Sequence, residues 1–125
     1  MTASRGFLAI APLFLALGIG LGMHMGASGD HTLSPVHAHV NLLGFALMMI
    51  FGLAYQVIPA AGNSGLARLH FWLHLGGSLV LLVMLSLMFL GKLSEAAMFP
   101  LAPIAEVAVL AGVLIFALNM YRHAR

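Results

Sequence analysis

Two histidines separated by a single residue, His37 and His39, begin a long apolar stretch of the chain. No Asp, Glu, Lys or Arg occurs from residue 37 to residue 58. Inside a membrane, polar side chains in such a stretch face protein, a cavity or a ligand. Imidazole is the commonest side-chain ligand of metals and also binds haem iron. The pair therefore predicts a cofactor site. The alternative is that both histidines merely cap the helix near the water interface.

The spacing of the pair limits what it can bind. Residues two apart on an α-helix are separated by about 200° around its axis, so His37 and His39 are expected to point to opposite sides. One small ion needs ligands three or four residues apart, whereas two back-to-back sites at one depth suit this pair. This geometry suits a helix that lies between two cofactor pockets, or one that is shared between neighbouring subunits. Asn41, one turn beyond His37, is expected to order the His37 ring.

The elements that must position these histidines follow from composition. The chain has 125 residues, of which 62% are hydrophobic and 6% charged, and its mean hydropathy is +1.09. A soluble domain carries about a quarter of its residues as charged side chains, so lipid is the expected solvent. Four apolar runs of roughly 20 residues can each cross a hydrocarbon core of ~30 Å as a helix. They are residues 6–25, 37–58, 69–90 and 97–119. The predicted fold is a single all-α domain of four transmembrane helices.

Composition also excludes several classes of function. A chain without cysteine has no disulfide, thiolate zinc site, iron–sulfur cluster or covalently attached haem. Five basic residues against three acidic ones are too few for a nucleic-acid-binding surface. No nucleic acid is therefore expected among the partners, which are instead the lipid bilayer and the cofactor.

The basic residues bear on membrane orientation, because cytoplasmic loops carry an excess of Lys and Arg. If both termini lie on the same side of the membrane, four of the five basic residues lie on that side and one lies on the other. Arg5, Arg68, Arg122 and Arg125 lie on the side of the termini, and Lys92 lies on the other. The chain is therefore predicted to be a multi-pass protein of a bacterial-type inner (plasma) membrane with both termini in the cytoplasm.

A second group of possible ligands lies near the end of the first apolar run. His24 stands between Met23 and Met25, on the same predicted outer side as the histidine pair, and is the rival second haem ligand within one subunit. Thioether and imidazole ligands also suit Cu(I), so this group together with His31 supports an alternative function as a copper-binding membrane protein. Methionine is equally ordinary as a filler of apolar surroundings.

Three further polar residues lie in the apolar runs. His70 and His74 have the spacing of four that one metal could use, but they are expected at the membrane interface, where imidazole is readily hydrated. Glu106 lies ten residues into the fourth run, where a charged carboxyl costs ~2.5 kcal/mol or more. Glu106 is expected to be protonated or hydrogen-bonded inside the bundle, with a proton relay as the alternative.

The region from residue 37 to residue 91 resembles part of the catalytic subunit of haem–copper oxidases. The nearest likeness is to the cbb3-type oxidases and their nitric-oxide-reductase relatives. Two elements are similar to the subunit's tenth helix, namely His37-Ala-His39-Val-Asn-Leu-Leu-Gly44 and Ile50-Phe-Gly52-Leu-Ala-Tyr55-Gln-Val-Ile-Pro59. A third, Leu69-His70-Phe71-Trp72-Leu73 with Gly76, is similar to the start of the eleventh. The first and last runs match only in position and hydrophobicity.

The resemblance implies haem-iron roles for the pair. In that family the first histidine ligates a high-spin haem and the second a low-spin haem on the other side, which would fall to His37 and His39. The chain lacks the helices that supply the family's copper ligands, its cross-linked tyrosine and the opposing ligand of the low-spin haem. It resembles the last of three four-helix units in a pseudo-threefold subunit. Three copies would restore the twelve-helix outline, so a homotrimer is expected.

In such a homotrimer each interface receives His37 from one subunit and His39 from its neighbour. The resemblance thus implies an intersubunit b-type haem held by two histidines, suited to electron transfer or, with an open axial position, to binding a diatomic gas. Reduction of nitric oxide or oxygen is the enzymatic alternative and needs a second metal in most such enzymes. A structural or assembly role without haem is the third alternative.

Overall fold

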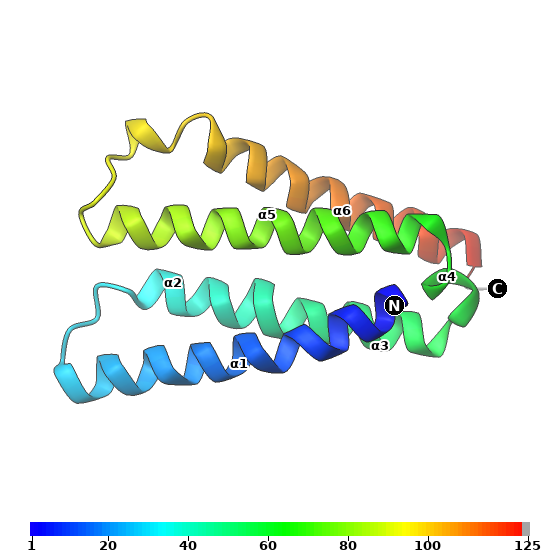
Figure 1. Ribbon diagram of the computed structural model, residues 1–125, viewed down its shortest axis with the longest axis horizontal. Coiled ribbons are helices and arrows are strands. Elements are labelled where there is room, and N and C mark those ends of the chain that lie inside the picture. Colours follow the sequence, from blue (N-terminus) through cyan, green and yellow to red (C-terminus); the bar gives the residue numbers. More distant parts are fainter. Residues whose placement is uncertain (124–125) are drawn as a thin grey trace.

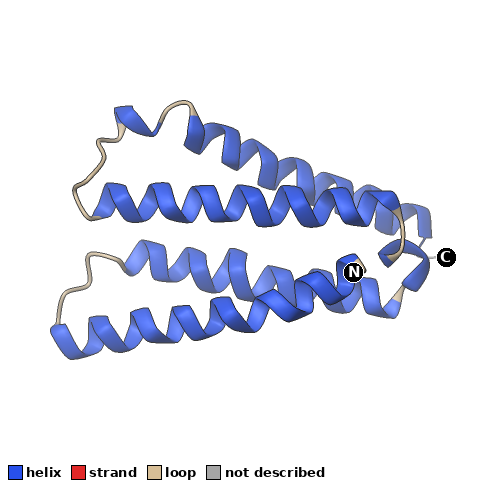
Figure 2. Cartoon of the chain, in the orientation of Figure 1, coloured by secondary structure: helices blue, strands red, loops and turns tan. Residues whose placement is uncertain are grey.

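The computed structural model describes residues 1–123, and within them every regular element is a helix (Figure 2). Four helical stretches are long and apolar enough to cross a membrane, which confirms the predicted fold class. They are α1 (Ala3–Ser28), the stretch Ser34–Val57, α5 (Gly65–Phe89) and α6 (Leu101–His123). The connections hold two short elements, α4 (Pro59–Gly62) and the 3₁₀ turn η2 (Ala96–Met98).

The stretch Ser34–Val57, here called helix two, is continuous but not uniform. It begins as α2 (Ser34–His39), passes through a π-helical segment, η1 (Val40–Ala46), and ends as α3 (Leu47–Val57). A π segment contains more residues per turn than an α-helix, and such segments are frequent at functional sites. Nothing in the apolar pattern of the sequence predicts this change.

Local sequence explains where the helices begin and end. The hydroxyl of Thr2 accepts a hydrogen bond from the backbone N–H of Arg5 and caps α1, and the hydroxyl of Ser64 does the same for α5 through Ala67. Gly29 ends α1 in the left-handed region, at φ 71°, which glycine adopts without steric cost.

The last helix begins later than the sequence predicts. The fourth apolar run starts at residue 97, whereas α6 starts at Leu101. Phe99 has extended backbone angles because the residue before a proline is disfavoured in the helical region, and Pro100 follows it. Residues 97–100 therefore belong to the connection, although they are apolar.

The molecule is built as two antiparallel helical hairpins (Figure 1). The first hairpin pairs α1 with helix two, and the second pairs α5 with α6. The N-terminus, α4 and the C-terminal end of α6 lie together, and we call this the terminal end. The turn between α1 and helix two and the connection before α6 lie at the opposite end, the loop end. Because helix two begins at the loop end, the histidine pair lies there too.

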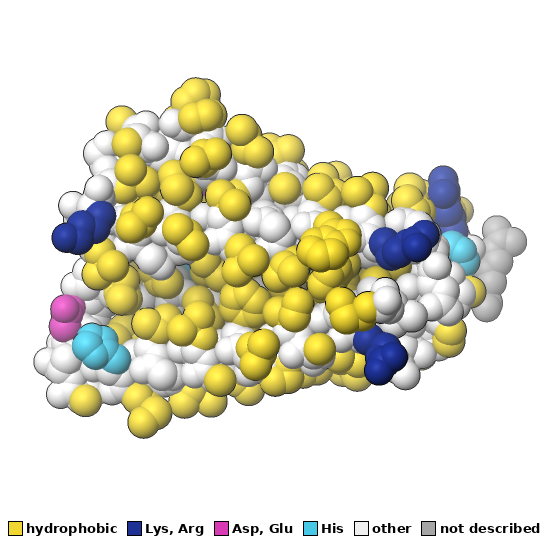
Figure 3. Space-filling view, viewed as in Figure 1, with side chains coloured by type: hydrophobic (Ala, Val, Ile, Leu, Met, Phe, Trp, Pro, Cys, Tyr) yellow, Lys and Arg dark blue, Asp and Glu magenta, His cyan; other side chains and the backbone are white. Residues whose placement is uncertain are grey.

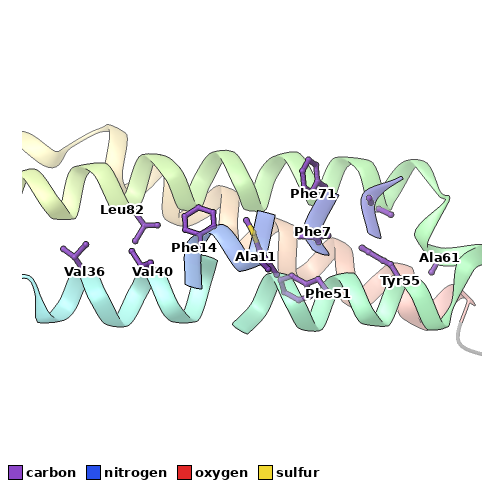
Figure 4. Packing of buried hydrophobic residues seen from close by; sticks show 13 residues of the cluster. Phe7, Ala11, Phe14, Val36, Val40, Phe51, Tyr55, Ala61, Phe71 and Leu82 are labelled. Carbon is purple, nitrogen blue, oxygen red and sulfur yellow. The ribbon is translucent and has the colours of Figure 1, made fainter. Parts of the chain in front are cut away.

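The two hairpins are joined by an apolar core that is richest in aromatic rings towards the terminal end. Phe7, Phe51, Tyr55 and Phe71 are buried and project into the space between the ribbons (Figure 4). The ring centroids of Phe7 and Phe71 are 5.0 Å apart in an edge-to-face arrangement, which is favourable for aromatic pairs. Towards the loop end an apolar hollow of about 320 Å³ separates the hairpins instead.

Within the first hairpin, small residues let the backbones approach, as small-residue ridges do in membrane helices. A Cβ at Gly18 would overlap the side chain of Asn41, and one at Gly44 would overlap the ring of Phe14. Gly18, Gly22 and Gly26 follow one another at four-residue spacing in α1, and the packing is close at Gly18. It does not extend to Gly26, which has open space around it.

On the face shown in Figure 3, the surface is largely apolar along the length of the hairpins, and the charged side chains lie near the two ends. In the most apolar part of α6 only 17% of residues are buried, against 39% in α5. Arg5, Arg68 and Arg122 lie at the terminal end and Lys92 at the loop end. This distribution is the one on which the predicted orientation depends; Arg125, the remaining basic residue, lies outside the described residues.

Candidate functional site

His37 faces α1. Its Cε1 atom would lie 3.1 Å from a Cβ placed on Gly22, so the absence of a side chain at that glycine makes room for the ring. The amide nitrogen of Asn41 lies 3.2 Å from Nε2 of His37 and 3.5 Å from Nδ1, and donates to the ring. The expected ordering of His37 by Asn41 is therefore present. The same contact occupies the ring nitrogen that most often serves as a ligand.

His39 is held differently. Its Nδ1 lies 2.7 Å from the carbonyl oxygen of Pro35, one turn earlier in the helix. A carbonyl can only accept, so Nδ1 carries the proton and donates it, which leaves the lone pair of the neutral ring on Nε2. Donation from the far nitrogen to a backbone carbonyl is the usual way in which proteins orient a metal-binding imidazole. His39 thus has the tautomer and the restraint of a ligand.

The two rings also lie on different faces of helix two. His37 is turned to α1. His39 lies about 200° from it around the axis, and its neighbours one turn further differ, since Leu42 is 54% exposed and Leu43 is buried. Both imidazoles are half-buried. The surroundings of the rings agree with the back-to-back arrangement that a spacing of two predicts.

His24 is not brought to the pair. It lies two residues beyond Gly22 and therefore about 200° away from the face of α1 that meets His37. It lines a separate polar hollow at the loop end together with Asp30 and Thr32. Hydrogen bonds from Thr32, first from its hydroxyl and then from its backbone N–H, lower the pKa of the Asp30 carboxyl below its usual range.

The methionines beside His24 diverge as well. Met25 is buried in the core, and Met23 is 70% exposed on the outside. Among residues 1–123, no group of three or more His, Cys, Asp or Glu side chains could hold a metal ion. Met23 and Met25 therefore lie on different sides of α1, and the copper-binding alternative stays a prediction.

A second histidine pair, predicted from the sequence to lie at the membrane interface, is in the core. His70 and His74 are both 0% exposed, and so is Ser78, one turn further along the same face of α5. The prediction of hydrated interfacial rings was wrong, because this face of α5 packs against protein rather than towards water. The recurrence of polar residues every four positions at 70, 74 and 78 was the signal that could have found this column.

The buried column is only partly hydrogen-bonded. Nδ1 of His70 lies 2.9 Å from the hydroxyl of Tyr55, and Nε2 of His74 donates to the carbonyl of Leu43 over 2.8 Å. Three buried atoms have no partner within the described chain: Nε2 of His70, Nδ1 of His74 and Oγ of Ser78. Buried polar groups are nearly always paired, so this column carries a cost that an ordinary apolar helix interface does not.

Glu106 was expected to be protonated or to be hydrogen-bonded to a neighbour inside the bundle, and the second arrangement is not found among the described residues. Its side chain is exposed on α6, where it lines a hollow with Glu95, Met88 and Met98 near the loop end. The outward face of α6 contacts no other helix of this chain within the described residues, which explains why the carboxyl stays on the surface. No relay partner inside the bundle is offered to it by residues 1–123.

Comparisons of the chain with known protein families, with curated proteins and with solved structures found no match. The likeness to haem–copper oxidases therefore remains a prediction from the motifs within residues 37–91. The two histidine pairs and their hydrogen bonds are the features of the chain that bear most directly on its function.

Proposed function

We propose that the protein is a membrane-embedded b-type haem-binding protein whose haem is held by the histidines of helix two, in a homotrimer, for electron transfer or for binding a diatomic gas. The observation that carries the proposal is the hydrogen bond from Nδ1 of His39 to the Pro35 carbonyl. It leaves Nε2 of His39 as a fixed, unprotonated ligand atom on the side of helix two away from the α1-facing His37.

The residues present fit a haem group in two further respects. Beyond His39, helix two carries the apolar side chains of Leu42, Ile50 and Leu53, each more than half exposed in one chain. A tetrapyrrole offers an apolar face, and burying apolar area is favourable. His37 lies only about 3 Å along the axis from His39, given a rise of 1.5 Å per residue, so the two rings are at nearly the same depth.

The two rings are unequally prepared for ligation. Nε2 of His39 is free, whereas Nε2 of His37 first has to be released by the Asn41 amide. Haem iron with two histidine ligands carries electrons, and iron with one open position binds a gas. The hydrogen bond between Asn41 and His37 is therefore the feature of this chain that decides between the two forms of the proposed function.

Absorption spectroscopy of the purified protein after haem supplementation tests the proposal. A Soret band with low-spin b-type features is expected, and it should disappear in the variant His39→Ala. His31→Ala is the matched control, because His31 is an exposed loop histidine whose ring contacts the Gly29 carbonyl. A colourless protein that still forms trimers in detergent would contradict haem binding and favour a structural role.

Carbon monoxide difference spectra then separate the two forms of the function, since iron bound by two histidines does not respond. His24→Ala tests the rival ligand within one subunit and should leave the spectrum unchanged. Loss of the low-spin signal in His24→Ala, with the oligomer intact, would replace His37 by His24 in the site.

A further inference from the structure

The π segment of helix two separates the part that carries His37 and His39 from the part that is packed into the aromatic core. In η1 the backbone N–H of Leu47 donates to the carbonyl of Leu42, five residues earlier, instead of to that of Leu43. A π segment therefore accommodates one residue more than the same length of α-helix. If it closed to an α-helix, everything on one side of it would rotate by about 100° relative to the other side.

His74 contacts the carbonyl that the Leu47 N–H would reach in an α-helix. Its Nε2 donates to the Leu43 oxygen over 2.8 Å, in a fully buried contact between α5 and η1. The ring is fixed beside Phe51 of α3, with ring centroids 5.2 Å apart. A buried carbonyl without a donor is strongly disfavoured, and the imidazole of His74 gives the Leu43 carbonyl a donor in place of the Leu47 N–H.

We propose that His74 is a positioning residue that holds the register of helix two, and through it the directions of His37 and His39. Without the donor of His74, the segment closes to an α-helix and satisfies the Leu43 carbonyl within helix two. The α3 part stays fixed by its core contacts, so the α2 part turns. His39 then changes direction, and His37 leaves the space at Gly22. The consequence for a haem rests on the proposed function; the consequence for the register does not.

The register is measured by a disulfide between α1 and helix two. The chain contains no cysteine, so the pair Gly18→Cys and Asn41→Cys forms the only possible bridge within it. These positions face one another, since a Cβ at Gly18 would meet the side chain of Asn41. A disulfide needs Cα atoms within about 7 Å and converging Cβ atoms, so a rotation of about 100° abolishes it. Cross-linking is scored in membranes before extraction, so that a variant that does not survive detergent is still measured.

Four versions of this cysteine pair are compared: parent, His74→Gln, His74→Leu and His74→Asn. The amide nitrogen of Gln reaches the place of Nε2, whereas that of Asn stops at the place of Nδ1. We expect cross-linking in His74→Gln to match the parent, and cross-linking in both His74→Leu and His74→Asn to fall at least fivefold. Ser78→Ala, one turn away on the same face, is the matched control and should behave as the parent. Unchanged cross-linking in His74→Leu and His74→Asn would overturn the proposal, as would an equal loss in His74→Gln.

The haem spectrum is the second readout, taken in proteins that keep Asn41. His74→Gln is expected to retain the low-spin band, and His74→Asn to lose it or to become sensitive to carbon monoxide. If the protein with its original sequence binds no haem, the proposed function fails while the cross-linking experiment still decides the role of His74. If the protein with its original sequence binds haem and all four cysteine-pair versions cross-link equally, the proposed function stands and the positioning role fails.

Discussion

The two histidine pairs of this protein differ in spacing, burial and hydrogen bonding, although all four rings lie in apolar helices. His37 and His39 are two residues apart, half-buried, and face opposite sides of helix two. His70 and His74 are four residues apart, fully buried, and face the same way from α5. In the first pair Nε2 of His39 is not used by its hydrogen bond to Pro35, whereas each ring of the second pair uses one nitrogen for a contact between helices and has no partner for the other within the described residues. The two pairs thus differ in what surrounds them: the rings proposed as ligands are partly exposed, and the rings that join helices are buried.

The largest expected effect of any single change is on haem binding in His39→Ala. Because a direct ligand is removed, haem affinity should fall by more than the roughly 10- to 100-fold that loss of a ligand's hydrogen-bond partner costs. Thermal stability should hardly change, since the ring is half-exposed and its hydrogen bond to Pro35 stays within its own helix. Haem titration and thermal unfolding of one preparation measure both. A large loss of stability with haem binding retained would show that His39 has a structural role instead.

The variant Tyr55→Phe, which removes the partner of His70 in the buried pair, is expected to lower the stability of the protein, in contrast to His39→Ala. The ring nitrogen of His70 then loses its partner at 2.9 Å, and a buried polar atom left unpaired costs roughly 1–3 kcal/mol. The free energy of unfolding in detergent, measured by denaturant titration, should fall by that amount. Tyr121→Phe is the matched control because Tyr121 is 81% exposed and should be neutral. Equal stability of both variants would remove the distinction between the two pairs.

A smaller effect is expected from Asn41→Ala, which frees Nε2 of His37. Releasing one hydrogen bond is worth about 0.5–1.5 kcal/mol, which corresponds to a rise in haem affinity of roughly two- to tenfold. The carbon monoxide response should decrease, because the second axial position is filled more readily. Asn63→Ala, in the loop before α5, is the control. Weaker haem binding in Asn41→Ala would instead make the amide a support of the ligand.

The smallest effect is expected from Ser78→Ala. The hydroxyl of Ser78 is buried without a partner among the described residues, so its removal sacrifices no hydrogen bond and relieves a desolvation cost. The free energy of unfolding should stay the same or rise by at most about 1 kcal/mol. A decrease measured in the same denaturant titration would show that the hydroxyl has a partner, such as an internal water, and that the column is more fully paired.

The four helices could be predicted from the sequence because apolar runs of this length have few alternatives in lipid. The opposite directions of His37 and His39 and the contact of Asn41 could be predicted as well, since both follow from helix geometry alone. The burial of His70 and His74 was not predicted, although the polar residues at 70, 74 and 78 recur on one face of α5. In a membrane, the lipid-facing and protein-facing sides of a helix are equally apolar, so hydropathy does not distinguish them.

The π segment was missed for a related reason. Its residues, Val40–Ala46, are as apolar as their neighbours, and the feature that accompanies it is a contact with His74, which is 31 positions away from Leu43. Glu106 was misplaced because the sequence gives its depth in the membrane but not the side of α6 on which it lies. Both features depend on which residues are neighbours in the folded chain, and a single sequence does not reveal those neighbours.

The division into two hairpins has a consequence for how the protein is made. Most packing of α1 is with the helix that immediately follows it, and most packing of α6 is with the helix that immediately precedes it. Contacts between sequence neighbours form quickly, because little chain has to be closed into a loop first. Each helical hairpin can thus form soon after its two helices are synthesised. The two hairpins then dock on one another through their aromatic rings.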